Sequence, residues 1–137
     1  MAQVPLIFDR PIAYVNCIPL GTLHYGRCSL FIPKLFRREN QFINFRELKS
    51  IGVYNSIALH GTFYRERNIE VVDNSSDDIL DLTMDMFDLL EGRPPLSDAI
   101  DLQRFYKEQF FGDDPDRGYA PNIGPRFALK YRDLIFA

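Results

Sequence analysis

Five residues in the first third of the chain are of types that could bind a phosphorylated sugar, namely Asn16, Gly21, His24, Arg46 and Glu47. The amide of Asn16 can read a sugar hydroxyl or a base edge, and Gly21 permits close approach of the backbone to a ligand. The planar guanidinium of Arg46 can hold a pyrophosphate through two hydrogen bonds. Glu47 can accept hydrogen bonds from sugar hydroxyls, and His24 is a residue type suited to proton transfer. We interpret the five as candidate substrate-binding residues and assign no catalytic residue.

Other kinds of site lack their sequence motifs. There is no Gly-rich dinucleotide or P-loop fingerprint and no Gly-x-Ser-x-Gly elbow. The two histidines and two cysteines, at positions 24, 60, 17 and 28, lack the short paired spacing of a zinc site. The acidic loop at 113–116 lacks the ordered ligand series of an EF-hand. We therefore expect no metal site and no cofactor.

Four aspartates, Asp77, Asp81, Asp85 and Asp88, are spaced four, four and three residues apart. This spacing is typical of the solvent-exposed face of a helix, where no desolvation raises the pKa of a carboxyl group. We therefore expect no acid–base catalysis from them.

Composition limits the classes of protein to be considered. A chain of 137 residues with 46% apolar residues suits one folded domain, and a net charge of −3 argues against a nucleic-acid binder. No apolar run approaches the roughly 20 residues that span a bilayer, and no signal peptide is evident. Two cysteines form no disulfide framework, so we expect a cytoplasmic protein. Residues 27–49 are rich in basic side chains, which suits a small anionic ligand or, alternatively, is simply a solvated face.

Two strands are expected to position the candidate residues. Ile12–Val15 is a continuous apolar run, typical of a strand buried on both faces, and Asn16 follows it. If that strand is parallel to its neighbours, residues 16–21 lie at the carboxyl end of a sheet, where ligands bind in open α/β folds. Ile69–Val72 predicts a second strand.

The second strand leads into the clearest helix signal in the chain, at 76–91. Asn74 or Ser75 can cap its amino end, and Gly92 ends it. We expect its apolar residues to share the buried face, namely Ile79, Leu80, Leu82, Met86, Phe87, Leu89 and Leu90. This strand–turn–helix unit is interpreted as half of a βαβ unit.

The remaining segments give weaker signals. Residues 29–32 could form a strand or begin a helix, and 50–62 and 112–118 are expected to be loops. Helices are predicted at 42–49, with Phe42, Phe45 and Leu48 on one face; at 97–111, with Ile100, Phe105 and Phe110 buried; and at 125–135. Strands separated by helices predict an α/β fold, with residues 1–92 as its core and 93–137 as a helical extension packed on the same domain.

Four blocks in order, residues 4–20, 44–47, 69–79 and 122–134, resemble the C-terminal part of a bacterial family of glycosyltransferase-like proteins linked to surface-carbohydrate assembly. That family looks like the two-domain GT-B sugar transferases, and the block containing Arg46 and Glu47 is similar to nucleotide-sugar 2-epimerases. The resemblance implies a partial Rossmann-like domain that binds the nucleotide-sugar donor. Transfer of the sugar to a hydroxyl would release a diphosphate stabilised by positive charge.

The resemblance also implies that other parts are needed for catalysis. Such enzymes have an N-terminal domain and a small-residue phosphate-binding loop ahead of the first block, and the chain begins after both. We therefore expect it not to be catalytic alone. The alternative is a non-catalytic interaction module that pairs through an exposed sheet edge with a partner chain or with itself, aided by Phe-rich segments at 31–45 and 105–111.

Overall fold

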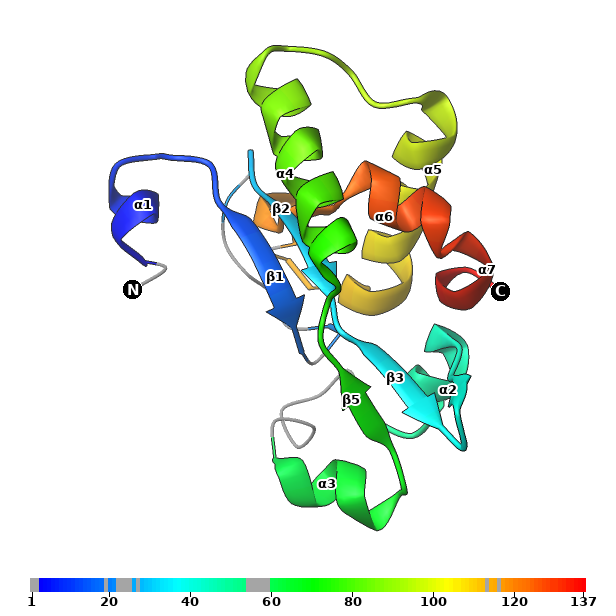
Figure 1. Cartoon of the computed structure of the whole chain (residues 1–137). Coiled ribbons are helices and arrows are strands. Elements are labelled where there is room, and N and C mark those ends of the chain that lie inside the picture. The colour runs from blue at the N-terminus through cyan, green and yellow to red at the C-terminus, as the bar shows by residue number, and fades with distance from the viewer. Residues whose placement is uncertain are drawn as a thin grey trace.

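The computed structural model describes residues 3–18, 20–21, 26, 28–53, 60–112, 114–115 and 117–137 (Figure 1). His24 and residues 54–59 of the predicted 50–62 loop lie outside these residues. The described chain is an α/β structure with two three-stranded sheets, one parallel and one antiparallel. The expected α/β class is therefore confirmed.

The parallel sheet consists of β1 (Ala13–Cys17), β2 (Leu30–Pro33) and β6 (Asn122–Ile123), in the order β1-β2-β6. Every residue of the central strand β2 is buried, as expected for an apolar run covered on both faces. The ambiguous segment 29–32 is thus a strand. β6 places part of the segment after residue 93 in this sheet.

β1 differs from its prediction because it is an edge strand. Among the described strands it pairs only with β2, and the side chains of Ala13 and Val15 are exposed, Val15 by 40%. The expectation that 12–15 is buried on both faces is therefore wrong. An apolar run indicates a strand, but its position in the sheet depends on partners elsewhere in the chain.

The antiparallel sheet consists of β3 (Leu35–Arg38), β4 (Gln41–Phe42) and β5 (Glu70–Val72), in the order β4-β3-β5. A tight turn joins β3 and β4, with positive φ at both central residues, as a hairpin of this length requires. Only Lys34 separates β2 from β3, so one extended segment contributes to both sheets. Because β5 pairs antiparallel to β3, the strand–helix unit at 69–91 is not half of a parallel βαβ unit, and that interpretation is wrong.

The predicted long helix is present as α4 (Ser76–Leu90). Ser75 caps it by accepting a hydrogen bond from the backbone N–H of Asp78 at 3.1 Å. Asp77 and Asp78 lie in its first turn, where their negative charges interact favourably with the positive end of the helix dipole. The chain leaves the helix at Gly92, whose φ of +71° suits a glycine. Both ends of this helix were predictable because their signals are local.

The buried face of α4 is not the predicted one. Asp78, Leu82 and Asp85 are buried, and Leu80 is 59% exposed. The other predicted core residues that are exposed are Ile79, Phe87, Leu89 and Leu90. α4 packs against the parallel sheet and against the helix α6 (Pro125–Lys130), which presents basic side chains to it. Asp78 and Asp85 therefore point inward, and for Asp85 this contradicts the predicted solvent-exposed face.

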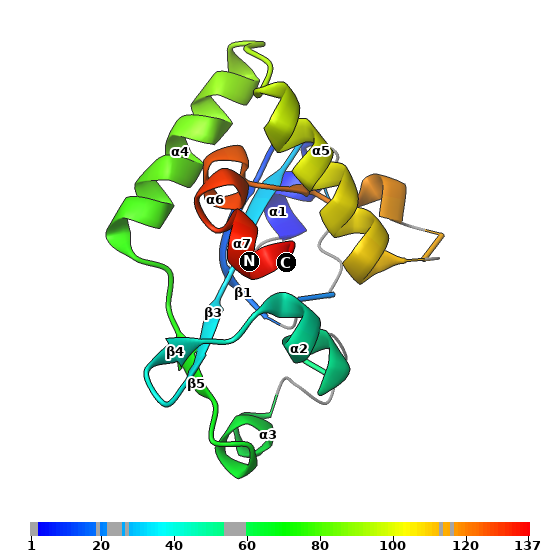
Figure 2. The same cartoon turned by 90° about the vertical axis from the view of Figure 1, so that its right-hand side faces the viewer.

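The predicted helix 97–111 is confirmed as α5 (Ser97–Tyr106) followed by a π-helical turn, Lys107–Phe111. Its buried residues are Ala99, Gln103, Tyr106 and Phe111. Ile100 and Phe105 are exposed and Phe110 is partly buried, so the predicted buried face is shifted. Figure 2 shows α4 and α5 on opposite sides of the molecule with α6 between them.

The remaining helices are short. The predicted terminal helix is divided at Tyr131 into α6 and α7 (Arg132–Ile135). Phe42 lies exposed in β4, so the predicted helix 42–49 begins only at Phe45. The other elements are α1 (Gln3–Ile7), α2 (Phe45–Ser50), α3 (Gly61–Glu66) and a 3-10 turn (Arg117–Tyr119). No described helix is long and apolar enough to cross a membrane.

The core is built around Tyr106, which is fully buried. Its ring contacts those of Phe31 on β2, Phe45 on α2 and Phe111, with centroids 5.4, 6.5 and 6.0 Å away. Its hydroxyl donates a hydrogen bond to the carbonyl oxygen of Leu20 at 3.0 Å. One side chain thus joins α5, the parallel sheet, α2 and the chain that follows β1.

Candidate functional site

A cavity of about 450 Å³ opens between α4, α5 and α6, next to the amino ends of β2 and β6. Apolar side chains and prolines form much of its wall, and Asp88, Arg93, Gln103, Asn122 and Arg126 provide polar groups. Ligand pockets of this size and mixed lining are common in proteins. The sequence predicts the candidate residues in 16–21 at the other end of the sheet, where the strands have their carboxyl ends.

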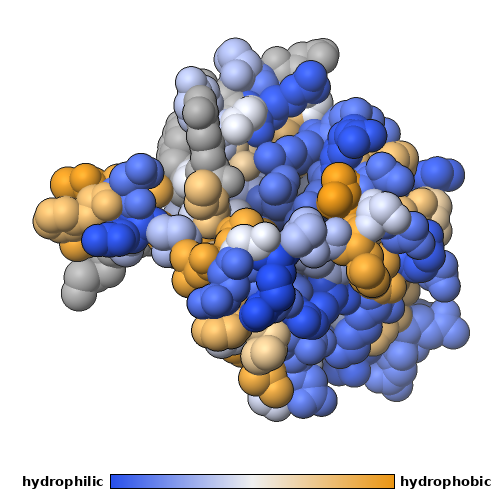
Figure 3. Space-filling view, turned by 90° about the horizontal axis from the view of Figure 1, so that it is seen from above, coloured by the Kyte–Doolittle hydropathy of each residue, from blue (hydrophilic) through white to orange (hydrophobic). Residues whose placement is uncertain are grey.

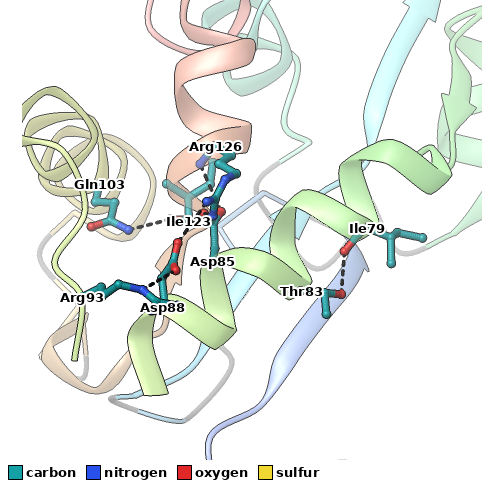
Figure 4. A network of polar contacts seen from close by, with 8 residues as sticks. All are labelled: Ile79, Thr83, Asp85, Asp88, Arg93, Gln103, Ile123 and Arg126. Atoms are coloured by element: carbon teal, nitrogen blue, oxygen red, sulfur yellow. Dashed lines mark hydrogen bonds and ion pairs between the residues drawn. The ribbon is translucent and has the colours of Figure 1, made fainter. Parts of the chain in front are cut away.

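An ionic network lies along one side of this cavity (Figure 4). The guanidinium of Arg126 donates from Nη1 to Asp85 at 2.5 Å and from Nη2 to Asp88 at 3.0 Å. Asp88 also accepts from Nε of Arg93 at 2.9 Å. The other oxygen of Asp85 accepts the backbone N–H of Arg126 at 3.1 Å, in the first turn of α6. Asp85 therefore satisfies a free N–H of α6 and pairs with a side chain of the same helix.

The two carboxylates of this network have opposite pKa shifts. Burial raises the pKa of Asp85, whose side chain is 3% exposed, although hydrogen bonds from Arg126 oppose the rise. Hydrogen bonds from Arg93 and Arg126 lower the pKa of the more exposed Asp88. The sequence reading excluded desolvation of these aspartates, and for Asp85 this is wrong. The two arginines and two aspartates sum to zero charge and each pairs within the network, so its first role is to hold α4 to α6.

A second buried carboxylate holds the other end of α6. Asp78 accepts hydrogen bonds from Lys130 Nζ at 2.6 Å and from the hydroxyl of Tyr131 at 3.0 Å. Burial opposes ionisation of Asp78, but the contacts led by Lys130 lower its pKa. α6 is therefore fixed to α4 by buried carboxylates at both ends.

Gln103 lies in the cavity wall and is only 7% exposed. Its Nε2 donates to the carbonyl oxygen of Ile123 at 2.8 Å, which sets the orientation of the amide. Its Oε1 accepts no hydrogen bond from the described residues. Sequence reasoning missed this residue, since a glutamine on a helix carries no signal of burial.

Asn16 lies within β1, where its φ is +55°, and not after the strand as predicted. Its backbone N–H donates to the side chain of Asn74 at 2.6 Å, and its side chain accepts the N–H of Asn74 at 2.7 Å. Asn74 also donates from Nδ2 to the carbonyl oxygen of Pro33 at 2.8 Å. This arrangement joins the ends of β1 and β2 to the connection between β5 and α4. The amide of Asn16 is thus already used for structure.

Two other candidates adjoin the same aromatic side chain. Gly21 follows Leu20, whose carbonyl oxygen binds Tyr106. Arg46 follows Phe45, whose ring packs near Tyr106. Gly21 and Arg46 thus each directly follow a residue that contacts Tyr106, and no contact between the two is described.

Arg46 and Glu47 lie in α2, which Asn44 caps by accepting the N–H of Glu47 at 2.8 Å. Arg46 is exposed and makes no ion pair with the described residues. Glu47 accepts a hydrogen bond from Arg38 at 2.8 Å. Arg46 therefore has its charged group unpaired among the described residues, and Glu47 retains one carboxylate oxygen that does not bind Arg38.

Other cations of the basic segment are also paired. Lys34 lies 2.7 Å from Asp73, and Arg37 donates twice to Glu70, at 2.6 and 2.8 Å. Along the described part of residues 27–49, much of the positive charge is therefore balanced by nearby carboxylates. This favours the solvated-face interpretation for these particular residues.

Neither Cys17 nor a metal centre forms a candidate site among the described residues. Cys17 is buried, and burial raises the pKa of its thiol to about 12, so it is a neutral thiol at physiological pH. No group of three or more His, Cys, Asp or Glu side chains among the described residues could hold a metal ion.

The fold defines an α/β protein with a three-stranded parallel sheet. The chain matches no known protein family, no curated protein and no solved structure. Its function is therefore inferred from its own residues and their geometry.

Proposed function

We propose that the chain is the donor-side, nucleotide-sugar-binding portion of a glycosyltransferase-like protein of surface-polysaccharide assembly, and that it is not catalytic alone. The observation that carries this proposal is the exposed Arg46, which has no described ion pair and follows a residue that packs on Tyr106. Gly21 lies near the same side chain, beyond the carboxyl end of the parallel strand β1. Ligands of open α/β sheets bind at this end of the strands.

Each residue has a distinct part in this proposal. The guanidinium of Arg46 would bind the diphosphate of the donor and stabilise the charge that develops on the leaving group. Gly21 would let the backbone approach the donor, and Glu47 would orient the guanidinium of Arg38 as well as accept sugar hydroxyls. Asn16 would act through its hydrogen bonds to Asn74, by fixing the end of β1. A further α/β unit would supply the acceptor site.

The test is an amide-correlation NMR titration of the isolated chain with UDP-, GDP-, ADP- and CMP-sugars. We expect the signals of Gly21 and Arg46 to move with one nucleotide. Because a charge-assisted hydrogen bond is lost, Arg46→Ala should weaken binding about tenfold or more. Arg65→Ala is the matched control, since Arg65 is also exposed on a short helix and has no described ion pair. Dispersed signals that none of the four donors moves would contradict donor binding by this chain.

A second candidate function, self-association, is favoured by an exposed apolar surface. Leu80, Met84 and Phe87 form a stripe on α4 that faces away from α6, and they are 43–59% exposed. The exposed Val15 lies on the neighbouring edge strand β1. In the view from above, the projecting α1 is a separate apolar area at the left (Figure 3).

The occupant that fits this surface is a second copy of the chain. A two-fold axis beside β1 and perpendicular to the sheet would pair the two β1 strands antiparallel. Because α4 covers β1 and β2, the same axis would bring the two α4 stripes together on one face (Figure 1). Two-fold interfaces are self-complementary, and an exposed edge strand is a template for pairing with another chain.

Sedimentation velocity over a range of concentrations tests this association. We expect a monomer–dimer equilibrium that Met84→Glu shifts to monomer, because a charge would then lie in the apolar contact. Phe42→Glu is the control, since Phe42 is similarly exposed, at 49%, in β4. A monomer at every concentration, or equal effects of the two variants, would rule the dimer out.

A further inference from the structure

We propose that the cavity between α4, α5 and α6 binds a small monocarboxylate that has an apolar body and a hydrogen-bond donor at its far end. This site is distinct from the proposed donor site, because it lies at the amino ends of the parallel strands and shares none of the predicted residues. The proposal rests on three features of the cavity: an amide oxygen without a described protein partner, exposed apolar walls and a guanidinium with unpaired Nη atoms.

The acceptor is Oε1 of Gln103. The side chain is more than nine-tenths buried, and its Nε2 is committed to Ile123, so the amide cannot turn without leaving that carbonyl oxygen unpaired. Its Oε1 has no described protein partner and is not among the buried unsatisfied atoms, so it is accessible to a ligand donor. The neighbouring Asn122 also makes no described side-chain hydrogen bond. A hydroxyl or amide N–H from a ligand would satisfy Oε1 of Gln103.

The walls are apolar and incompletely covered. Leu89, Leu96 and Ile100 line the cavity and are 38%, 71% and 39% exposed. The consecutive residues Pro94 and Pro95 form part of the same wall and restrict the backbone there. An apolar ligand body would cover side chains that no described residue covers, and burial of such surface favours binding.

The third feature selects the charge of the ligand. Arg93 uses Nε to bind Asp88 and its guanidinium lies 5.3 Å from the centre of the Phe87 ring, while its Nη atoms make no described hydrogen bond. Figure 4 shows Arg93 on the same side of the ionic network as Gln103, whereas Arg126 uses both Nη atoms to bind Asp85 and Asp88. The free Nη atoms suit one carboxylate. Because the two arginines and two aspartates of the network sum to zero charge, a ligand with several negative charges, such as a diphosphate, is disfavoured.

The probes for this site are 8-hydroxyoctanoate, octanoate and 1,8-octanediol, which carry both polar groups, only the carboxylate and only hydroxyls. Methyl- and amide-correlation NMR titrations of the full chain report on Leu89, Leu96, Ile100 and Gln103. We expect saturable shifts at these residues, with 8-hydroxyoctanoate binding tightest.

Two variants separate the parts of the proposal. Arg93→Gln should weaken binding of the two carboxylates about tenfold and leave binding of octanediol unchanged. Its control is Arg104→Gln, an exposed arginine of α5 that is not in the cavity wall. Ile100→Trp should abolish binding of all three probes by filling the cavity, with its amide spectrum showing an intact fold.

The proposal is overturned if no probe gives saturable shifts, if Arg93→Gln affects octanediol and the carboxylates equally, or if the shifts spread over the exposed faces of α1 and α4 as in non-specific partition. None of these outcomes bears on nucleotide-sugar binding, which is measured at Gly21 and Arg46.

Discussion

Asp78 and Asp85 lie on the inner face of α4, and each is held by a basic side chain of α6. Their environments nevertheless differ. Contacts led by Lys130 outweigh burial at Asp78 and lower its pKa, whereas burial outweighs Arg126 at Asp85 and raises its pKa. A pairing partner alone therefore does not decide which protonation state the folded protein prefers.

The opposite shifts predict opposite dependences of stability on pH. A lowered folded pKa contributes stability above the ordinary aspartate value that is lost as pH falls through the folded value, and this applies to Asp78. A raised folded pKa contributes stability below the ordinary value that is lost as pH rises through the folded value, and this applies to Asp85. From about pH 3 to 7, the destabilisation by Asp78→Asn should therefore grow and that by Asp85→Asn should shrink.

Urea unfolding of the native chain and of both variants across this pH range measures the two differences. Asp77→Asn, an exposed position in the same helix, provides the baseline for removing one negative charge from α4. Differences that change in the same direction with pH would contradict the assignment of opposite shifts.

At the scale of elements, α4 shows that the limits of a helix and its buried face are set separately. The capping Ser75 and the terminal Gly92 were recognisable in sequence. The buried face of α4 was not recognisable, because an apolar stripe marks the buried side of a helix only if no polar residues of that helix find partners in the interior. Here α6 packs against the side of α4 that carries Asp78 and Asp85, and its basic side chains form ion pairs with both.

Because the buried face of α4 differs from the predicted one, substitutions of Leu82 and Leu80 should have unequal effects on stability. Leu82→Ala should destabilise the protein by about 2–5 kcal/mol, because Leu82 is fully buried and would leave a cavity. Leu80→Ala should change the free energy of unfolding of the monomer by less than about 0.5 kcal/mol, because Leu80 is exposed. Urea unfolding at low protein concentration measures both values. Equal losses of unfolding free energy would indicate that Leu80 is buried as well, as the apolar pattern predicted.

At the scale of the molecule, Tyr106 connects elements that are distant in sequence. Its hydroxyl reaches a carbonyl 86 residues away, and its ring packs against β2 and α2. Tyr64, also buried, stacks on Phe36, but its hydroxyl has no hydrogen-bond partner in the described part of the chain. Burial alone raises the pKa of Tyr64 to about 12.

The two tyrosines provide a matched pair of substitutions. Tyr106→Phe should cost about 1–3 kcal/mol of stability, because the buried carbonyl oxygen of Leu20 loses its donor. Tyr64→Phe should be neutral or stabilising, because it removes a buried hydroxyl that pairs with nothing. Thermal or urea unfolding measures both. A larger loss for Tyr64→Phe than for Tyr106→Phe would show that the hydroxyl contacts are misassigned.

The sequence by itself determined the α/β class, the strand–turn–helix at 69–91 and the extents of the helices at 76–90 and 97–111. These features follow from caps, turn residues and periodicity, which act within a few residues of the chain. Among the candidate ligand residues, Arg46 is exposed and unpaired among the described residues, and its part in binding stays a prediction.

Only the tertiary structure decided the sheet in which β5 pairs, the edge position of β1, the burial of Asp85, the mutual hydrogen bonds of Asn16 and Asn74, and the cavity lined by Gln103. Asn16 and Asn74 are 58 residues apart, and Asp85 and Arg126 are 41 apart. The free energies of such contacts depend on which surfaces the fold brings together, and local propensity does not carry that information.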